Sequence, residues 1–197
     1  MISGTKACAE LGAIIMLVSV AGATAAAPSP LPLGELMQML ASVESAQARF
    51  VETRHSALLK APLVLQGTLA YRRPDRVEKH VLTPYDERTI VEGGRLTVDN
   101  RTHNRKQVLV VSSAPGLAAL VESIRATRAG DLPALQRHFA LQVEGSRERW
   151  TLILRPLDAQ VGDYVVSLAL SGSGARIGQV TIEETSGDRS VMEIREQ

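Results

Sequence analysis

The sequence predicts a mostly β protein of the α+β class: an incomplete antiparallel β-barrel of about ten strands, with helices covering its open side. Short apolar segments with a period of two recur along the chain, and turn residues separate them at hairpin spacing. Helical periodicity is confined to one segment near the start and one in the middle of the chain. Strands and helices do not alternate, which argues against a doubly wound fold.

Residues 1–27 have the pattern of a cleaved signal peptide. The apolar segment 11–20 is too short to span a bilayer, and small residues after it allow cleavage near Ala25 or Ala27. The only cysteine, Cys8, lies before this segment, so it cannot be the lipidated cysteine that follows a lipoprotein signal. We therefore expect an exported protein; an uncleaved membrane anchor is the alternative.

Residues 28–197 are long enough for a single domain with its own core. The whole chain has 22 basic and 21 acidic side chains, and this balance argues against nucleic acid as a partner. Aromatic residues make up 3% of the chain, so no ladder of rings is available for stacking bases. No segment after the signal peptide is long and apolar enough for stable membrane insertion.

Two helical segments are predicted from apolar periodicity. The first has its apolar stripe at positions 33, 36, 37, 40 and 43, and such a stripe is usually part of the core. The second is capped by Ser112 or Ser113 and entered by Pro115, and a short third helix starts at Asp131. The stripe of the second helix contains Leu117, Leu120, Val121 and Ile124.

The strands are predicted from alternation and turn residues. The first covers residues 47–55, and residues 67–94 form a meander with breaks at Pro74 and Pro84. The glycines at 93 and 94 provide the positive φ angles of a tight hairpin. Further strands are expected at 96–99, 107–112, 139–143, 149–154, 164–170, 177–183 and 189–195.

No catalytic or metal-binding motif is present. The four histidines, at positions 55, 80, 103 and 138, are too far apart for any recognised ligand motif, and there is no nucleophile elbow or phosphate loop. His80 and Glu78 share one strand face, where a solvated surface position is expected. We expect a protein that is not an enzyme and that needs no cofactor or metal.

A curved sheet closed by helices has an interior that either fills with side chains or holds a small ligand. This chain has few large aromatic residues and many leucines and valines. Composition and pattern alone leave open a well-packed core without a cavity.

The central meander resembles the LolA-type outer-membrane lipoprotein carriers and their relatives. The family pattern is G-x-L followed by Arg-Pro, a second Pro, an apolar strand and an acidic residue with Gly at a hairpin. The resemblance covers about residues 33–112. It rests on Ala48-Arg49-Phe50, Gly67, Leu69, Arg73-Pro74, Pro84, Ile90-Val91 and Glu92-Gly93.

The resemblance implies a monomeric periplasmic carrier that shields the acyl chains of lipoproteins or of a related lipidic cargo. Its partners would be an inner-membrane export complex and an outer-membrane receptor. The alternatives are a protein-binding assembly or signalling module, a carrier of a fatty-acid-derived gene-cluster product, and an enzyme on the same fold. The residues expected at the cargo cavity or its lid are Leu36, Leu40, Val43, Phe50, Leu69, Tyr71, Arg73, Val77, Lys79, Val81, Leu117, Leu120 and Ile124.

Two of these residues carry specific expectations. In the resembled family, the arginine of the Arg-Pro turn acts as a latch that bonds helical lid segments, so Arg73 would do the same; a surface arginine is the alternative. Lys79 shares a strand face with Val77 and Val81. Because an unpaired buried ammonium is costly, either that face points outward or an anion meets Lys79, for example a carboxylate or phosphate on the cargo.

Overall fold

A computed structural model describes residues 30–111 and 123–196. Its strands are β1 (Ser45–His55), β2 (Leu63–Arg72), β3 (Arg76–Thr83), β4 (Glu87–Glu92), β5 (Arg95–Asn100), β6 (Arg105–Val110), β7 (Phe139–Ser146), β8 (Arg149–Pro156), β9 (Val165–Ser173), β10 (Arg176–Glu184) and β11 (Arg189–Glu196). Its helices are α1 (Leu33–Ala41), α3 (Leu132–His138) and the single turn α4 (Ala159–Gly162), together with a helix whose described part covers residues 123–129.

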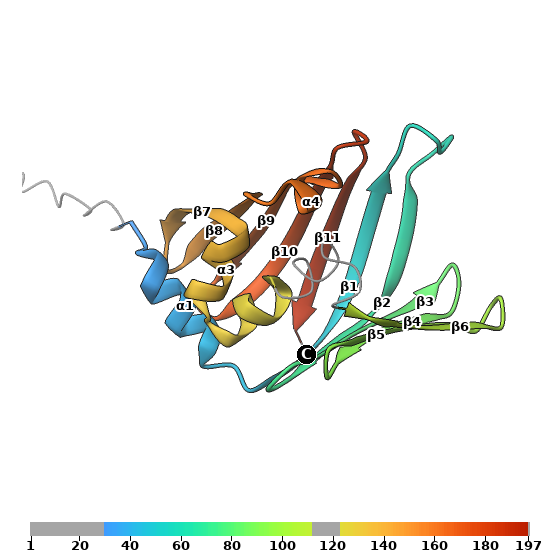
Figure 1. Cartoon of the computed structure of the whole chain (residues 1–197), viewed down its shortest axis with the longest axis horizontal. Helices are drawn as coiled ribbons and strands as arrows, with labels where there is room; N and C mark the ends of the chain where they lie inside the picture. Colours follow the sequence, from blue (N-terminus) through green and yellow to red (C-terminus); the bar gives the residue numbers. More distant parts are fainter. Residues whose placement is uncertain (1–29, 112–122, 197) are drawn as a thin grey trace, which may run out of the picture.

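The strands form one antiparallel sheet in the order β6-β5-β4-β3-β2-β1-β11-β10-β9-β8-β7. β6 and β7 are the two edges, so the sheet is not closed. The fold class predicted from the sequence is confirmed, with eleven strands where about ten were expected. In Figure 1 the sheet bends strongly, and β3 to β6 turn across from the plane of β7 to β11.

The helices pack on β7 to β10 and form the main core with them (Figure 1). Leu36 and Leu40 of α1 are fully buried there, against apolar side chains of β8 and β9. Trp150 of β8 is also buried, and its Nε1 donates a hydrogen bond to the carbonyl oxygen of Gly174 at 2.9 Å. This core fixes the helices over one half of the curved sheet.

The helix boundaries predicted from the sequence are confirmed in part. Asp131 caps α3 by accepting a hydrogen bond from the Ala134 backbone at 3.1 Å. α1 ends at Ala41 with Ser42 as its C-cap, so Val43 lies beyond the helix in which the apolar stripe placed it. The expected helical residues Leu117 and Leu120 lie outside the described residues.

A second, smaller core lies where β1, β2 and β3 meet, and it consists of Phe50, Leu65 and Val81. Gly67 allows this packing because β2 comes very close to β3 at this point. A Cβ atom on Gly67 would lie 1.9 Å from the carbonyl oxygen of His80 and 2.9 Å from the Phe50 ring. The β2–β3 register also shifts between Gln66 and Gly67.

None of the helices in the described part of the chain is long and apolar enough to cross a bilayer.

Candidate functional site

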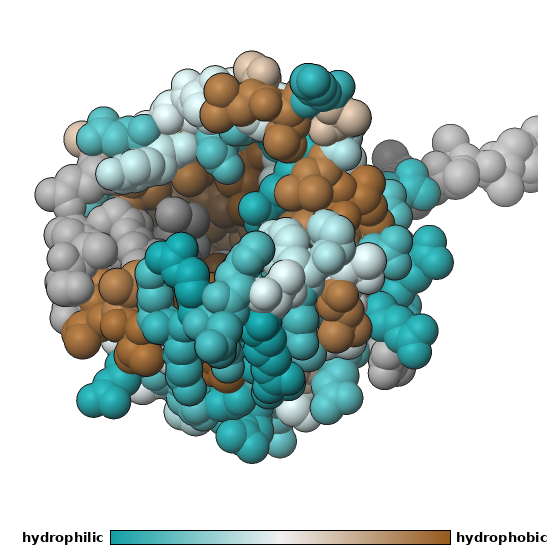
Figure 2. Space-filling model, turned by 90° about the vertical axis from the view of Figure 1, so that its right-hand side faces the viewer, coloured by the Kyte–Doolittle hydropathy of each residue, from teal (hydrophilic) through white to brown (hydrophobic). Residues whose placement is uncertain are grey.

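A largely apolar cavity lies on the concave side of the sheet, between β1 to β3, β8 to β11 and the helical residues 123–129. Its volume is about 330 Å³. This is near the lower end of the roughly 300–1,000 Å³ of small-molecule sites. Figure 2 looks into a hollow whose visible wall is largely hydrophobic. The apolar lining includes Leu69, Val77, Leu154, Leu168, Leu170, Ile177, Val180, Ile182, Met192 and Ile194.

The structure brings five of the sequence-predicted residues to this cavity: Leu69, Tyr71, Val77, Lys79 and Ile124. Other predicted residues pack elsewhere. Leu36 and Leu40 belong to the main core, and Phe50 and Val81 belong to the smaller one. Val43 is half-buried in the connection between α1 and β1.

Lys79 points inward and meets a carboxylate of the protein itself. Its Nζ forms an ion pair with Glu52 of β1 and lies 5.1 Å from the centroid of the Phe50 ring. The Glu52 side chain is only 3% exposed. It accepts two more hydrogen bonds, from Ser190 Oγ at 2.7 Å and from Arg54 Nε at 2.7 Å. The anion expected opposite Lys79 is therefore supplied within the wall of the cavity.

The pKa values of this pair reflect burial and mutual attraction. Burial would raise the pKa of Glu52, but the charge of Lys79 and the hydrogen bonds from Lys79, Ser190 and Arg54 outweigh it and lower the pKa. Burial lowers the pKa of Lys79, and the nearby Glu52 charge offsets that only in part. Glu52 is thus held as a carboxylate with three donors around it.

Arg73 lies at the turn between β2 and β3 and is exposed, yet it reaches a helix. Its Nη2 donates to the carbonyl oxygen of Ala41, the last residue of α1, and its backbone N–H donates to the carbonyl oxygen of Glu44 at 2.9 Å. The last carbonyls of a helix have no hydrogen-bond partner within the helix. A cation at this end also interacts favourably with the negative end of the helix dipole. Arg73 therefore fastens the end of α1 to the β2–β3 turn.

A second polar group on the cavity wall consists of Arg128 and Tyr71. The guanidinium of Arg128 lies over the Tyr71 ring, 5.6 Å from its centroid, and its Nη2 lies 3.9 Å from a carboxylate oxygen of Glu196. Burial lowers the pKa of Arg128, and the charge of Glu196 opposes this shift. Both side chains line the cavity.

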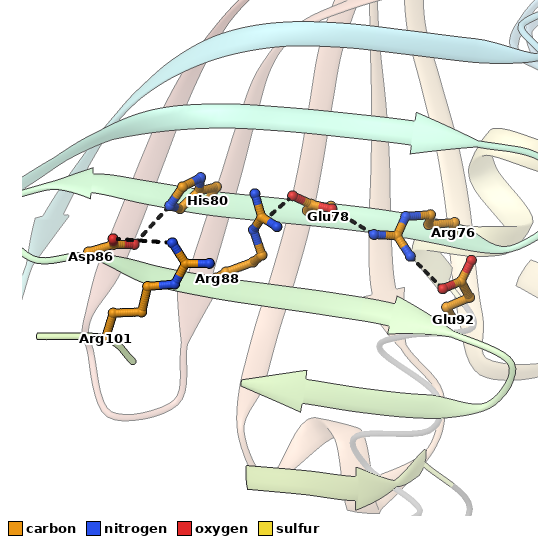
Figure 3. A network of polar contacts seen from close by, with 7 residues as sticks. All are labelled: Arg76, Glu78, His80, Asp86, Arg88, Glu92 and Arg101. Atoms are coloured by element: carbon orange, nitrogen blue, oxygen red, sulfur yellow. Dashed lines mark hydrogen bonds and ion pairs between the residues drawn. The ribbon is translucent and has the colours of Figure 1, made fainter. Parts of the chain in front are cut away.

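On the face of β3 opposite to that of Lys79, as strand alternation sets it, charged side chains form a network (Figure 3). Glu78 lies 2.9 Å from Arg76 and 3.1 Å from Arg88, and His80 Nε2 lies 2.8 Å from Asp86. Glu78 and His80, expected to be solvated, are therefore half-buried and engaged with neighbours. These contacts link β3 to β4 and to the turn between them.

Across residues 30–111 and 123–196, no group of three or more His, Cys, Asp or Glu side chains is placed to hold a metal ion.

Sequence reasoning missed Glu52, Arg128 and Ser190. Glu52 could have been found, because it has the same strand parity as Ala48 and Phe50 and so faces inward with them. Arg128 follows Ile124 by four residues and so shares its helix face. Ser190 carries no such signal on its own.

A family model described as "Outer membrane lipoprotein carrier protein LolA-like" matches residues 25–192. A comparison with curated proteins gave no match. Among solved structures, a LolA superfamily protein from Nitrosomonas europaea is similar at 12% identity and a TM-score of 0.44, over 84% of this chain and 92% of that chain. MucB of Pseudomonas aeruginosa, in a structure of its complex with MucA, is similar at 15% identity and a TM-score of 0.44, over 82% of this chain and 55% of that chain.

Proposed function

The chain belongs to the LolA-like family of outer membrane lipoprotein carrier proteins, and we propose on this basis that it is a periplasmic carrier of acyl chains. In this proposal the cavity holds the chains of a lipoprotein, or of a related lipidic cargo, and the protein ferries them towards the outer membrane. The family resemblance seen in residues 33–112 is confirmed by a match that extends over most of the chain.

The observation that carries the proposal is the apolar cavity. Its wall is built from leucine, isoleucine, valine and methionine side chains of β8 to β11, with β1 to β3 opposite. Each methylene moved from water into such a wall contributes about 0.8 kcal/mol. A carrier of this kind needs no catalytic step, because transfer depends only on the relative affinities of donor, carrier and acceptor.

The proposal includes export and two docking partners. Residues 1–27 would be removed as a signal peptide, and the mature protein would work as a monomer in the periplasm. It would receive cargo from an inner-membrane export complex and deliver it to an outer-membrane receptor. The contact between Arg73 and the end of α1 is where we propose that a lid is held.

Chain-length dependence tests this function. The purified protein is titrated with methyl esters of octanoic, decanoic and dodecanoic acid, in competition with a fluorescent fatty acid. Because each buried methylene contributes about 0.8 kcal/mol, affinity should rise roughly fourfold per methylene until the cavity is full. Affinity that does not change with chain length would contradict the proposal.

A protein-binding module is the second candidate, and the edge strand β6 favours it. Val108 and Leu109 of β6 are 55% and 44% exposed, and β5 is its only strand neighbour in the described sheet. An exposed edge can accept a strand from a partner. Such a module has no need for acyl affinity, so the same titration separates the two functions.

A further inference from the structure

Two polar atoms of cavity-lining residues have no hydrogen-bond partner among the residues that the structure describes. They are the hydroxyl of Tyr71 and Nη1 of Arg128, and both atoms are buried. The Tyr71 residue is 6% exposed and the Arg128 side chain is 14% exposed. A buried donor without an acceptor is destabilising, so this pair marks a candidate site for an external acceptor.

The geometry suits an acceptor with a negative charge. A guanidinium has five N–H donors and no acceptor, and Glu196 approaches only Nη2, at a distance of 3.9 Å. Nη1 therefore has no acceptor among the described residues, and because both atoms are buried, a shift of the two side chains into the cavity is needed for Nη1 and the Tyr71 hydroxyl to donate to one ligand group. The guanidinium carbon lies over the Tyr71 ring, 5.6 Å from its centroid, so the two side chains are neighbours at the cavity.

The other two cations among the cavity-lining residues, Lys79 and Arg54, are both paired with Glu52 and cannot play this part. Lys79 is already paired with Glu52, which has two further donors. Tyr71 lies opposite Ala46 on β1, and Glu52 is six residues further along that strand. At about 3.3 Å per residue, Glu52 lies roughly 20 Å along β1 from the level of Tyr71, whereas Lys79 lies two residues along β3 from Val77, the strand partner of Tyr71. An acyl chain that starts at Arg128 would run along the apolar side chains of β9 to β11.

We propose that the cargo has one acyl chain and a singly charged carboxylate head, and that Arg128 and Tyr71 bind this carboxylate. The proposal rests on the carrier function and adds the chemical class of the cargo. The cavity volume of about 330 Å³ fits one slender chain better than a bundle of three. A doubly charged phosphate head is disfavoured, because Glu196 lies beside the same guanidinium.

The test compares dodecanoate with methyl dodecanoate and dodecyl phosphate at neutral pH. Because hydrogen bonds to charged groups are the strong ones, the wild-type protein should bind dodecanoate at least about tenfold more tightly than the ester. It should also prefer dodecanoate to dodecyl phosphate. Arg128→Met should abolish the preference for the acid while the affinity for the ester is kept. Tyr71→Phe should reduce the preference, since it removes only the hydroxyl.

Two further variants separate recognition from general damage. Arg125→Met removes a cation from the same helix, but Arg125 pairs with Asp131 at 3.3 Å and does not line the cavity, so the preference should persist. Glu196→Gln removes a charge that repels the carboxylate, so it should tighten dodecanoate binding and leave ester binding unchanged. This gain would not occur if Arg128 served only to pair with Glu196.

The outcomes distinguish the two proposals. Equal affinity for acid and ester, with both binding in a chain-length-dependent manner, would overturn the carboxylate site and leave the carrier function standing. Failure of all acyl ligands to bind would overturn both. If Arg128→Met does not fold, an unchanged preference in Tyr71→Phe together with no gain in Glu196→Gln would still overturn the carboxylate site.

Discussion

Replacing Glu52 with glutamine lowers the free energy of unfolding by about 3 kcal/mol, because it leaves the half-buried ammonium of Lys79 without its counter-charge. The amide that replaces the carboxylate is also a weaker acceptor for Ser190 and Arg54. Urea denaturation at pH 7 measures the change. For a domain of this size, the melting temperature should fall by roughly 10 °C.

The destabilisation has a defined pH dependence. The pKa of Glu52 is lowered in the folded protein from an ordinary value of 4.5. The carboxylate therefore contributes stability that is fully present above pH 4.5 and is lost as the pH falls through its folded-state pKa. The difference between wild type and Glu52→Gln should be constant from pH 7 down to about 5 and should shrink at lower pH.

Two controls define the source of the effect. Glu193→Gln changes an exposed glutamate on β11, and its effect should stay within about 0.5 kcal/mol. The double variant Glu52→Leu with Lys79→Leu removes both charges and should recover much of the lost stability, since a buried pair is often replaceable by apolar side chains. If Glu52→Gln were as stable as wild type, Glu52 would not be paired as described.

Gly67→Val prevents β2 from pairing with β3 and costs about 3 kcal/mol or more, or abolishes folding. The reason is steric: even the first side-chain carbon would lie 1.9 Å from the His80 carbonyl oxygen. The strands would have to separate at the point where Phe50 and Val81 pack. Circular dichroism and thermal denaturation of the purified variant measure the effect.

Gly178→Ala is the matched control, because Gly178 is also a strand glycine of this sheet. The nearest atom to its added Cβ would be the Ser171 carbonyl oxygen at 3.8 Å, an ordinary contact. Its stability should change by less than about 1 kcal/mol. If Gly67→Val were as mild as Gly178→Ala, the close approach of β2 and β3 would be wrong.

Local sequence signals were sufficient for most of the sheet. In β2, Leu65 and Tyr71 alternate with polar residues, and alternation of this kind is set by the burial of one face. The hairpin after β4 was predicted because glycine can adopt the positive φ angles that other residues avoid. Gly93 and Gly94 do adopt them. Such signals depend on neighbours in sequence. The single turn α4 is too short to show helical periodicity, and it was missed.

The polar contacts at the cavity join residues that are far apart in the sequence, and they could be predicted only in part. The sequence indicated that Lys79 needs an anion or an outward face. It could not identify Glu52, which is 27 residues away and becomes a neighbour only through the pairing of β1, β2 and β3. The same holds for Arg128 and Tyr71, which the fold brings together across 57 positions of sequence, counted from 71 to 128.

The central claim is that an acyl chain occupies the cavity beneath β8 to β11, and one measurement tests it most directly. Val180 lines the cavity, whereas its neighbour Thr181 has the opposite strand parity and does not. Binding of a fluorescent fatty acid is measured for Val180→Trp and Thr181→Trp, after thermal denaturation has shown both to be folded. We predict that Val180→Trp fills the space and weakens binding at least tenfold, while Thr181→Trp binds as wild type does. Wild-type affinity in a folded Val180→Trp protein would contradict the account.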